Sequence, residues 1–337
     1  MKKMKIGKTG FEVSRVSMGT LAIGGESVWG DSDDEQSIRT IHSARDLGIN
    51  FFDTAPVYGF GRSERVLGKA LGAERSGFIV SSKCGLVWDL AEGPILYSRD
   101  GYDVRRNTTA KNIKREIDIS LKRLNTDYID IYYTHWQAIE EFPVPIAETM
   151  GALMDLKKEG KIRAIGASNV SGDQIREYLK YGRIDIIQNR FSMLDQMSFR
   201  ELNPLLLEND ITFHAYSPFE RGLLTGAVDM NFVVKPADAR SAIKWYETSR
   251  RREVLDMLDG WKPLCEKYAC TLAGLAVAWL IHQGPNINVD AGSRRVKAIE
   301  ENARGGEITL EEADIAAMTK KIDFLVDKYA DEAKMPR

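Results

Sequence analysis

The chain has 337 residues, of which 43% are hydrophobic and 28% charged, so it can bury the core of an ordinary globular protein. Lysine and arginine number 47 against 49 acidic residues, and the formal charge of −2 gives no general attraction to nucleic acid or to an anionic membrane. The sequence has three cysteines without a Cys-x-x-Cys pair, no signal-peptide pattern and no apolar run long enough to span a bilayer. These features argue against a secreted or membrane protein and predict a soluble, cytoplasmic one.

Eight short apolar runs alternate with helical periodicity along the chain. The runs are rich in β-branched and aromatic residues and cover 16–18, 49–54, 78–83, 128–135, 162–168, 184–189, 211–216 and 287–291. Between the third and fourth runs, apolar residues from Ile113 to Leu124 recur at helical spacing and predict an amphipathic helix. Strands this apolar are buried on both faces, as in parallel sheets, and eight of them favour a closed (β/α)₈ TIM barrel over an open doubly wound sheet. Because no linker divides the chain, we expect residues 1–337 to form a single domain.

Two segments lie outside this repeating pattern. Residues 4–15, with Lys8-Thr9-Gly10 at the turn, predict an N-terminal β-hairpin that closes the bottom of the barrel. Residues 222–249 form a long loop after the seventh strand. Insertions at that place lie over the C-terminal mouth of a barrel and shape its site.

Four polar residues lie at or just after the ends of consecutive predicted strands. Asp53 ends the second strand, Tyr58 follows in the next loop, Lys83 ends the third strand and His135 ends the fourth. Each has an ordinary explanation when taken alone, as a cap, a packing ring, a solvated charge or a hydrogen-bonding imidazole. The carboxyl ends of barrel strands meet at one mouth, however, and we therefore expect the four side chains to share a site.

These residue types together make a proton donor. An ammonium next to a phenol favours the phenolate and lowers its pKa, so Lys83 would make Tyr58 a better acid at neutral pH. Asp53 would hold the lysine in place without a metal, and the imidazole of His135 would donate a hydrogen bond to a substrate carbonyl. No Gly-x-Ser-x-Gly elbow, Cys–His pairing or metal-ligand spacing supplies a nucleophile. A hydride carried by a cofactor would fill that gap.

The residues around this site resemble the signature of the aldo-keto reductases. Residues 48–59, Gly-Ile-Asn-Phe-Phe-Asp-Thr-Ala-Pro-Val-Tyr-Gly, and residues 61–64, Gly-Arg-Ser-Glu, carry the resemblance, which continues through 121–130, 160–169, 216–219 and 222–224. Within the family, the chain resembles the bacterial sugar- and aldehyde-reducing branch and the related potassium-channel β subunits. The resemblance implies that Asp53, Tyr58, Lys83 and His135 are the catalytic tetrad of a metal-independent, NADPH-dependent carbonyl reductase.

The cofactor site is expected after the eighth strand, because the sequence lacks the Gly-x-Gly-x-x-Gly of a Rossmann fold. There, Gly292-Ser293-Arg294-Arg295 leads into a helix. Backbone N–H groups at a helix start, together with two arginines, can bind a phosphate. The alternative is that this basic segment is only a solvated helix start. The resemblance implies that Ser293 and Arg294 contact the 2′-phosphate of NADPH. NADH remains open as a second cofactor.

The resemblance also implies the other cofactor contacts. Glu301 and Asn302 would reach the adenine, and Tyr216 would stack on the nicotinamide ring. The carboxamide would be held by Ser168, Asn169 and Gln188. Four further residues would run along the pyrophosphate, namely Ser217, Phe219, Gly222 and Leu223. The remaining expected contacts are Gly19, Thr20, Asp53 and Gly292.

Two positions depart from the family pattern. Ala298 stands where relatives commonly carry glutamine or arginine, and Asp290-Ala291-Gly292 replaces the usual Ile-Pro-Gly. A carboxylate at position 290 would weaken the preference for a 2′-phosphate, so the departure keeps dual use of NADH and NADPH open.

Aromatic residues predict the walls of the substrate site. Trp29, Trp88, Trp136 and Trp245 lie in loops expected around the mouth, where they would join Tyr58 and His135 in contacting substrate. Residues 97–106 add polar and cationic groups to the loop after the third strand. We therefore expect a small-molecule carbonyl substrate, such as an aldose or a sugar derivative that bears an anionic group, and no nucleic-acid or membrane partner. A homo-oligomer remains open.

Two other classes of function remain open. One is an NADP-binding regulatory or scaffold protein of low turnover, as the channel β subunits suggest. The other is a barrel isomerase or hydrolase that uses Asp53 with another carboxylate, and it predicts no tight binding of pyridine nucleotide.

Overall fold

A computed structural model describes residues 1–25, 30–235 and 238–330 of the protein. In this part of the chain, parallel strands close into an eight-stranded barrel, and β13 pairs with β3 to complete the ring. This confirms the predicted (β/α)₈ barrel. The strands, in chain order, are β3 (Val16–Gly19), β4 (Phe51–Asp53), β5 (Ile79–Cys84), β9 (Ile129–Thr134), β10 (Ile162–Ser168), β11 (Ile186–Arg190), β12 (Thr212–Tyr216) and β13 (Ile287–Asp290).

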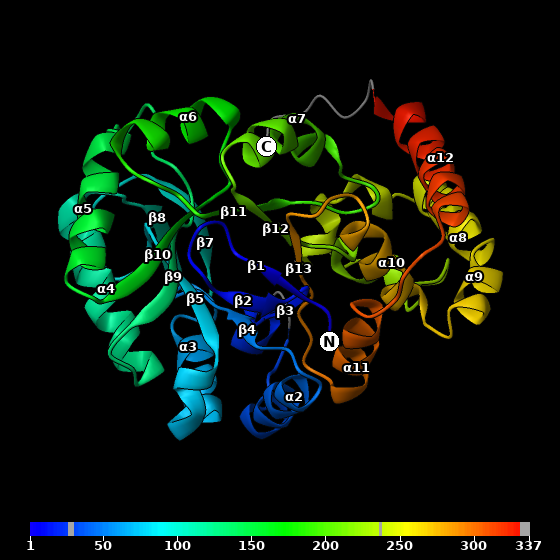
Figure 1. Ribbon diagram of the computed structural model, residues 1–337, viewed down its shortest axis with the longest axis horizontal. Coiled ribbons are helices and arrows are strands. Elements are labelled where there is room, and N and C mark those ends of the chain that lie inside the picture. The colour runs from blue at the N-terminus through cyan, green and yellow to red at the C-terminus, as the bar shows by residue number, and fades with distance from the viewer. Residues whose placement is uncertain (26–29, 236–237, 331–337) are drawn as a thin grey trace.

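Helices surround the ring of strands (Figure 1). The predicted helix between the third and fourth strands is α4, which Thr109 caps by accepting a hydrogen bond from the Asn112 backbone and which ends at Asn125 in a left-handed conformation. The helices that follow barrel strands are α2 (Asp34–Asp46), α3 (Arg62–Leu71), α4 (Ala110–Leu124), α5 (Ile146–Lys158), α6 (Gly172–Tyr181), α7 (Met197–Glu208), α10 (Leu272–Ile281) and α11 (Val296–Gly305). Further helices are α8 (Thr248–Asp259), α9 (Lys262–Lys267) and α12 (Glu312–Lys328).

The N-terminal hairpin closes one end of the barrel, as predicted. Its strands are β1 (Lys3–Lys5) and β2 (Glu12–Ser14), which pair antiparallel. Ile6 and Val13 are fully buried in a cluster with residues of the barrel strands. The hairpin therefore supplies the apolar floor of the barrel.

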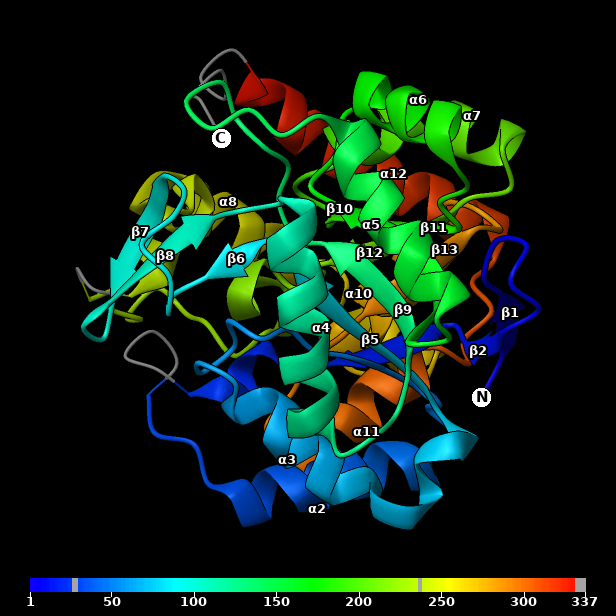
Figure 2. The same cartoon turned by 90° about the vertical axis from the view of Figure 1, so that its left-hand side faces the viewer.

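A three-stranded antiparallel sheet lies at the opposite end of the barrel from the hairpin (Figure 2). It consists of β6 (Leu86–Val87), β7 (Ile95–Arg99) and β8 (Tyr102–Arg106), and it was not predicted. Several of its side chains, including Ile95 and Tyr102, are exposed, so these strands do not show the buried apolar pattern of the barrel strands.

The long loop after the seventh strand is present as predicted. Short 3₁₀ helices run through it, η3 (Glu220–Thr225), η4 (Ala239–Ala242) and η5 (Lys244–Tyr246), and two others occur elsewhere, η1 (Leu21–Gly24) and η2 (Gly72–Gly77). Among the described residues, no single helix has the length and hydropathy to cross a membrane. Residues 248–267 and 272–281 pass that test only together, across an 84° bend, and residues 273–281 are buried inside the fold.

Candidate active site

The four predicted catalytic side chains meet at the ends of β4, β5 and β9 and in the loop after β4. The ammonium of Lys83 is fully buried and donates to Oδ2 of Asp53 at 2.6 Å and to the carbonyl of Thr54 at 2.9 Å. Its Nζ lies 4.8 Å from the centre of the Tyr58 ring. That ring meets the His135 imidazole edge to face, with 5.8 Å between ring centres. The structure thus brings all four side chains together.

Ser81 supports the carboxylate of this cluster, and it was missed in the sequence. Its hydroxyl donates to Oδ1 of Asp53 at 2.6 Å, so each oxygen of that carboxylate accepts a hydrogen bond. Ser81 stands opposite Asp53 in the β4–β5 ladder and two residues before Lys83, on the same face of the strand. Strand alternation from Lys83 is the signal that would have found it.

The electrostatics of Tyr58 differ from the expectation. We expected Lys83 to lower the pKa of the phenol, but the pKa is raised well above its ordinary value by burial first and by Asp53 second. Asp53 pairs with Lys83 and offsets its charge, while burial penalises the phenolate. Both effects favour the neutral phenol at Tyr58.

His135 is neutral as well. Burial, and then the charge of Lys83, hold its pKa well below the ordinary value. A neutral imidazole keeps one N–H donor, and this agrees with the predicted donation of a hydrogen bond to a carbonyl oxygen.

The residues predicted to hold the carboxamide form one hydrogen-bonded group beside His135. Asn169, in a left-handed conformation, donates to the His135 carbonyl at 2.9 Å and to the Ser168 hydroxyl at 3.1 Å. It accepts from the Tyr216 hydroxyl at 2.7 Å. Gln188 lies in the same layer of the barrel and contacts Nδ1 of His214 at 3.0 Å. The group thus joins the ends of β10, β11 and β12.

The turn after β12 holds an arginine that the sequence did not single out. Ser217, Glu220 and Arg221 all have positive φ, so the backbone is strained across this turn, which also contains Phe219, Gly222 and the buried Leu223. Among the described residues, Nη1 of Arg221 is buried without a hydrogen-bond partner. A phosphate group would satisfy that donor, and the turn therefore fits the predicted pyrophosphate of a dinucleotide.

The predicted phosphate residues lie at the start of α11. Ser293 and Arg294 are both half-buried, and Arg294 donates to the carbonyl of Asp31 at 2.9 Å. On the helix itself, Glu301 is half-buried, whereas Asn302 is buried and donates to the Ala291 carbonyl at 3.1 Å. Asn302 therefore fixes α11 to the end of β13.

Small residues close the barrel beside this helix. A Cβ on Gly292 would lie 2.5 Å from the carbonyl oxygen of Gly19, so the ends of β3 and β13 pack too tightly for a side chain there. Thr20 is fully buried, and its hydroxyl donates to the Asp53 carbonyl at 2.8 Å. These positions hold the strand end that carries Asp53.

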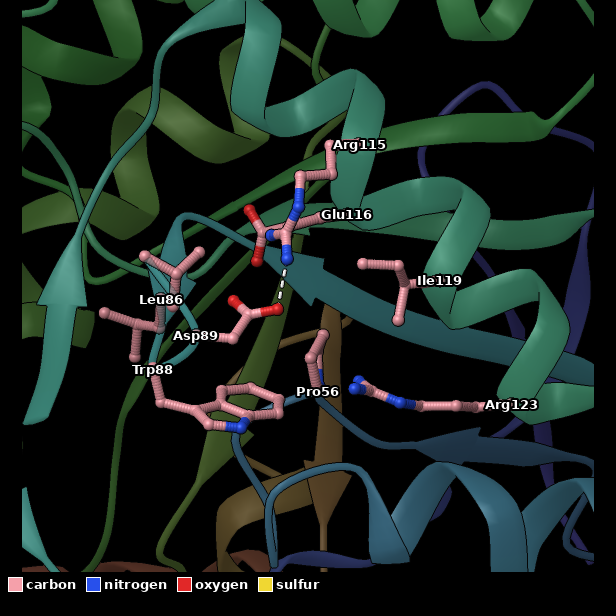
Figure 3. Close-up of a pocket in the computed structure, with 9 residues that line it drawn as sticks. Pro56, Leu86, Trp88, Asp89, Arg115, Glu116, Ile119 and Arg123 are labelled. Carbon is pink, nitrogen blue, oxygen red and sulfur yellow. Dashed lines mark hydrogen bonds and ion pairs between the residues drawn. The ribbon is translucent and has the colours of Figure 1, made fainter. Parts of the chain in front are cut away.

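The predicted aromatic walls divide into two groups. Trp88 and Trp136 pack in one apolar cluster with Tyr58, and Trp88 also lines a small surface pocket beside Asp89 and Arg115, which pair with each other (Figure 3). Trp245 instead meets Tyr329 edge to face, with ring centres 5.7 Å apart, which favours a packing role over substrate contact. Trp29 lies outside the described residues. The described residues contain no group of three or more His, Cys, Asp or Glu side chains that could hold a metal ion.

Comparison with known proteins agrees with the fold. The chain is 43% identical over 327 residues to an NADH-specific methylglyoxal reductase of Escherichia coli (strain K12), covering 96% of this chain and 99% of that enzyme. It is 31% identical over 323 residues to a probable voltage-gated potassium channel subunit beta of Arabidopsis thaliana, covering 91% and 92%. A glycerol dehydrogenase from Gluconobacter oxydans superposes with a TM-score of 0.85 at 30% identity, covering 99% of this chain and 97% of that one. The Aldo/keto reductase family model matches residues 15–323, and the chain belongs to that family.

Proposed function

We propose that this protein is an NAD(P)H-dependent reductase that converts a small polar aldehyde or ketone to the alcohol, with Tyr58 as the general acid. The observation that carries the proposal is the buried Lys83–Asp53 pair beneath the ring of Tyr58, with the neutral His135 at its edge. This arrangement offers two neutral donors to one carbonyl oxygen and a fixed positive charge behind one of them.

Each of these residues has a separate role in the proposed reaction. A bound nicotinamide cofactor supplies the hydride. His135 donates a hydrogen bond that orients the carbonyl, and Tyr58 transfers its proton to the oxygen as negative charge develops there. Lys83 then stabilises the phenolate that remains, while Asp53 and Ser81 keep the ammonium in position. The raised pKa of Tyr58 prevents it from losing the proton earlier.

For the cofactor we propose use of both NADPH and NADH. Ser293 and Arg294 at the start of α11 support a contact with a 2′-phosphate. The similar Escherichia coli enzyme is described as NADH-specific, which supports NADH as well. Both nucleotides present the same nicotinamide to Tyr58 and the same pyrophosphate to Arg221.

For the substrate we propose a short, hydroxylated or sugar-like carbonyl compound. The similar proteins named for methylglyoxal and for glycerol support a small polar substrate. Residues 97–106 belong to the sheet at the C-terminal end of the barrel, and their cationic side chains support a preference for an anionic group. Steady-state assays with matched neutral and anionic aldoses test this, and equal kcat/KM for the two sets would remove the preference.

We also propose that residues 1–337 act as a single cytoplasmic domain.

The substitution Tyr58→Phe tests the proposed function. It removes the donor and keeps the ring, so kcat should fall by about 10²–10⁴-fold while the Kd for NADPH stays within about twofold. Consumption of NADPH with methylglyoxal gives the rate, and fluorescence titration gives the Kd. Unchanged kcat would remove Tyr58 from the mechanism. Tight NADPH binding by the wild-type protein without turnover of any carbonyl would instead favour a regulatory role like that of the channel subunits.

A further inference from the structure

Asp290 brings a second carboxyl group into the layer of side chains that contains Asp53. It ends β13 and stands opposite Ser17 of β3, whereas Asp53 of β4 stands opposite Gly19 of β3. Ser17 and Gly19 share the inner face of their strand, because side chains alternate along it. Because β3 lies between β13 and β4, only Gly19 separates the carboxyl group of Asp290 from that of Asp53.

The carboxyl group of Asp290 occupies the space that this glycine leaves. A Cβ on Gly19 would lie 2.6 Å from Oδ1 and 2.7 Å from Oδ2 of Asp290, so no larger residue fits at position 19 without moving the carboxyl group. Asp290 thereby leans across β3 toward Asp53 and Lys83. The sequence suggested an influence on the 2′-phosphate, but the structure places this carboxyl group at the catalytic end of the site.

Asp290 lacks a full set of partners within the protein. Its Oδ1 is buried, and among the described residues it has no hydrogen-bond partner. Burial and then the nearby Asp53 raise its pKa well above the ordinary value, against the opposing effects of Lys83 and Ser17. A buried polar group without a partner is unfavourable, and at a functional site a bound ligand is one way in which it is satisfied.

The neighbouring strand indicates which part of a ligand meets this group. Ala215 of β12 pairs with Val289 of β13, and Tyr216 and Asp290 are the next residues along these two neighbouring strands. Asp290 therefore stands between Asp53 and Tyr216, the residue expected beneath the nicotinamide ring. That ring carries a positive charge in the oxidised cofactor and none in the reduced one.

We propose that Asp290 ionises when the oxidised cofactor binds and that its carboxylate stabilises the positively charged nicotinamide. The inference rests on the proposed function, since it requires a nicotinamide at this site. With hydride supplied by a bound nicotinamide to the carbonyl carbon, Tyr58 would give its proton to the carbonyl oxygen and regain one from solvent, while the proton of Asp290 would pass to solvent. Asp290 thus favours hydride donation within the complex and slows release of the oxidised cofactor.

Three ionisable groups that face Asp290, Tyr58, Tyr133 and His214, each keep one protonation state between about pH 6 and about pH 9, the range in which the inference is tested. Tyr58 and Tyr133 of β9 have pKa values raised well above their ordinary value by burial, so both stay protonated. Burial lowers the pKa of His214 of β12 to about 4, and that imidazole is held by the Ser17 and Tyr133 hydroxyls. Asp53 and Lys83 form their ion pair, and Tyr216 donates to Asn169.

Binding of NAD⁺ and NADH to the wild-type protein, Asp290→Asn and Asp290→Leu tests the inference. Titration calorimetry between about pH 6 and about pH 9, in two buffers of different ionisation enthalpy, gives both Kd values and the protons released. In the wild type, NAD⁺ should bind roughly tenfold more tightly at the upper pH and release up to one proton per site, while NADH binding stays constant. Both variants should lose the pH dependence and the proton release. At the upper pH, the ratio of the Kd for NAD⁺ to the Kd for NADH should be roughly tenfold higher in each variant than in the wild type.

Controls separate this inference from the proposed function. Asp173→Asn, at a side chain that is 96% exposed, should leave both Kd values unchanged. Circular dichroism checks that the two Asp290 variants are folded, and the leucine variant replaces the carboxyl group by an apolar side chain if the amide does not fold. Wild-type pH dependence in a folded variant would overturn the role of Asp290 alone. Failure of the wild-type protein to bind either nucleotide would overturn the proposed function.

Discussion

Tyr58, His135 and Asp290 all have pKa values displaced from the ordinary range, and burial is the first cause for each. Each displacement favours the neutral form of the side chain. Beside these neutral groups, Lys83 and Asp53 form a buried ion pair. In such a medium of low polarisability, a hydrogen bond to a developing oxyanion is stronger than in water.

The single residue Arg294 should decide the choice between the two nucleotides. Arg294→Ala should weaken binding of NADPH by about 1.5–3 kcal/mol, because a charge-assisted contact with the 2′-phosphate is lost, and should leave NADH nearly unaffected. Fluorescence titration of each nucleotide measures the effect. Arg304→Ala, near the other end of α11, is the matched control, since Arg304 donates to the Tyr268 carbonyl. Equal losses for both nucleotides would contradict the phosphate assignment.

At the scale of elements, the long loop after β12 stabilises the strained turn at its own beginning. The Tyr246 hydroxyl of η5 donates to the carbonyls of Glu220 and Arg221 at 3.2 and 3.0 Å, and Arg240 of η4 donates to the Arg221 carbonyl at 3.1 Å. Glu220 is itself paired with Arg190 and accepts from the Ser192 hydroxyl. The later part of the loop thus holds Arg221 where its unpartnered nitrogen can meet an anion.

Tyr246→Phe should therefore weaken dinucleotide binding without touching the tetrad. Loss of the hydroxyl removes both contacts to the turn, and the Kd for NADPH should rise by about five- to tenfold, corresponding to about 1 kcal/mol, with kcat nearly unchanged. Binding titration and steady-state kinetics measure the two quantities. Tyr329→Phe removes a surface hydroxyl that donates to Glu253 and serves as the control. A lower kcat with an unchanged Kd would show that the turn acts on chemistry instead.

At the scale of the whole molecule, the described residues include several buried acids with raised pKa values, namely Glu64, Glu116, Glu220 and Asp290. An acid whose pKa is higher in the folded state holds a proton that the unfolded chain releases, so folding is favoured at low pH and this contribution is lost as pH rises. For Glu116, which burial raises from 4.5 to about 8, the loss falls between these two values. The fold should therefore become less stable from mildly acidic to mildly alkaline pH.

Glu116→Gln should flatten part of this pH dependence. The amide cannot ionise, yet its oxygen can still accept from the Gly85 backbone and the Asn112 amide, which hold the carboxyl group at 2.7 Å each. Relative to the wild type, the variant should gain a few kcal/mol of unfolding free energy between about pH 5 and about pH 9. Denaturant unfolding at the two pH values measures the gain, with the surface variant Glu253→Gln as control. Parallel stability curves for wild type and Glu116→Gln would contradict the role of Glu116.

The sequence by itself predicted the barrel and the four residues of the proposed tetrad. Strands buried on both faces leave apolar runs, and Asp53, Lys83 and His135 stood out because each ends such a run. Only the tertiary structure decided which other groups join them. Closure of the barrel brings Asp290 over Gly19, the turn after β12 buries one nitrogen of Arg221, and Trp245 turns to Tyr329. The pattern of apolar residues along a segment indicates how deeply a strand is buried. Contacts between distant strands, and the loss of solvent that reverses the expected pKa shift of Tyr58, arise only when the chain is folded.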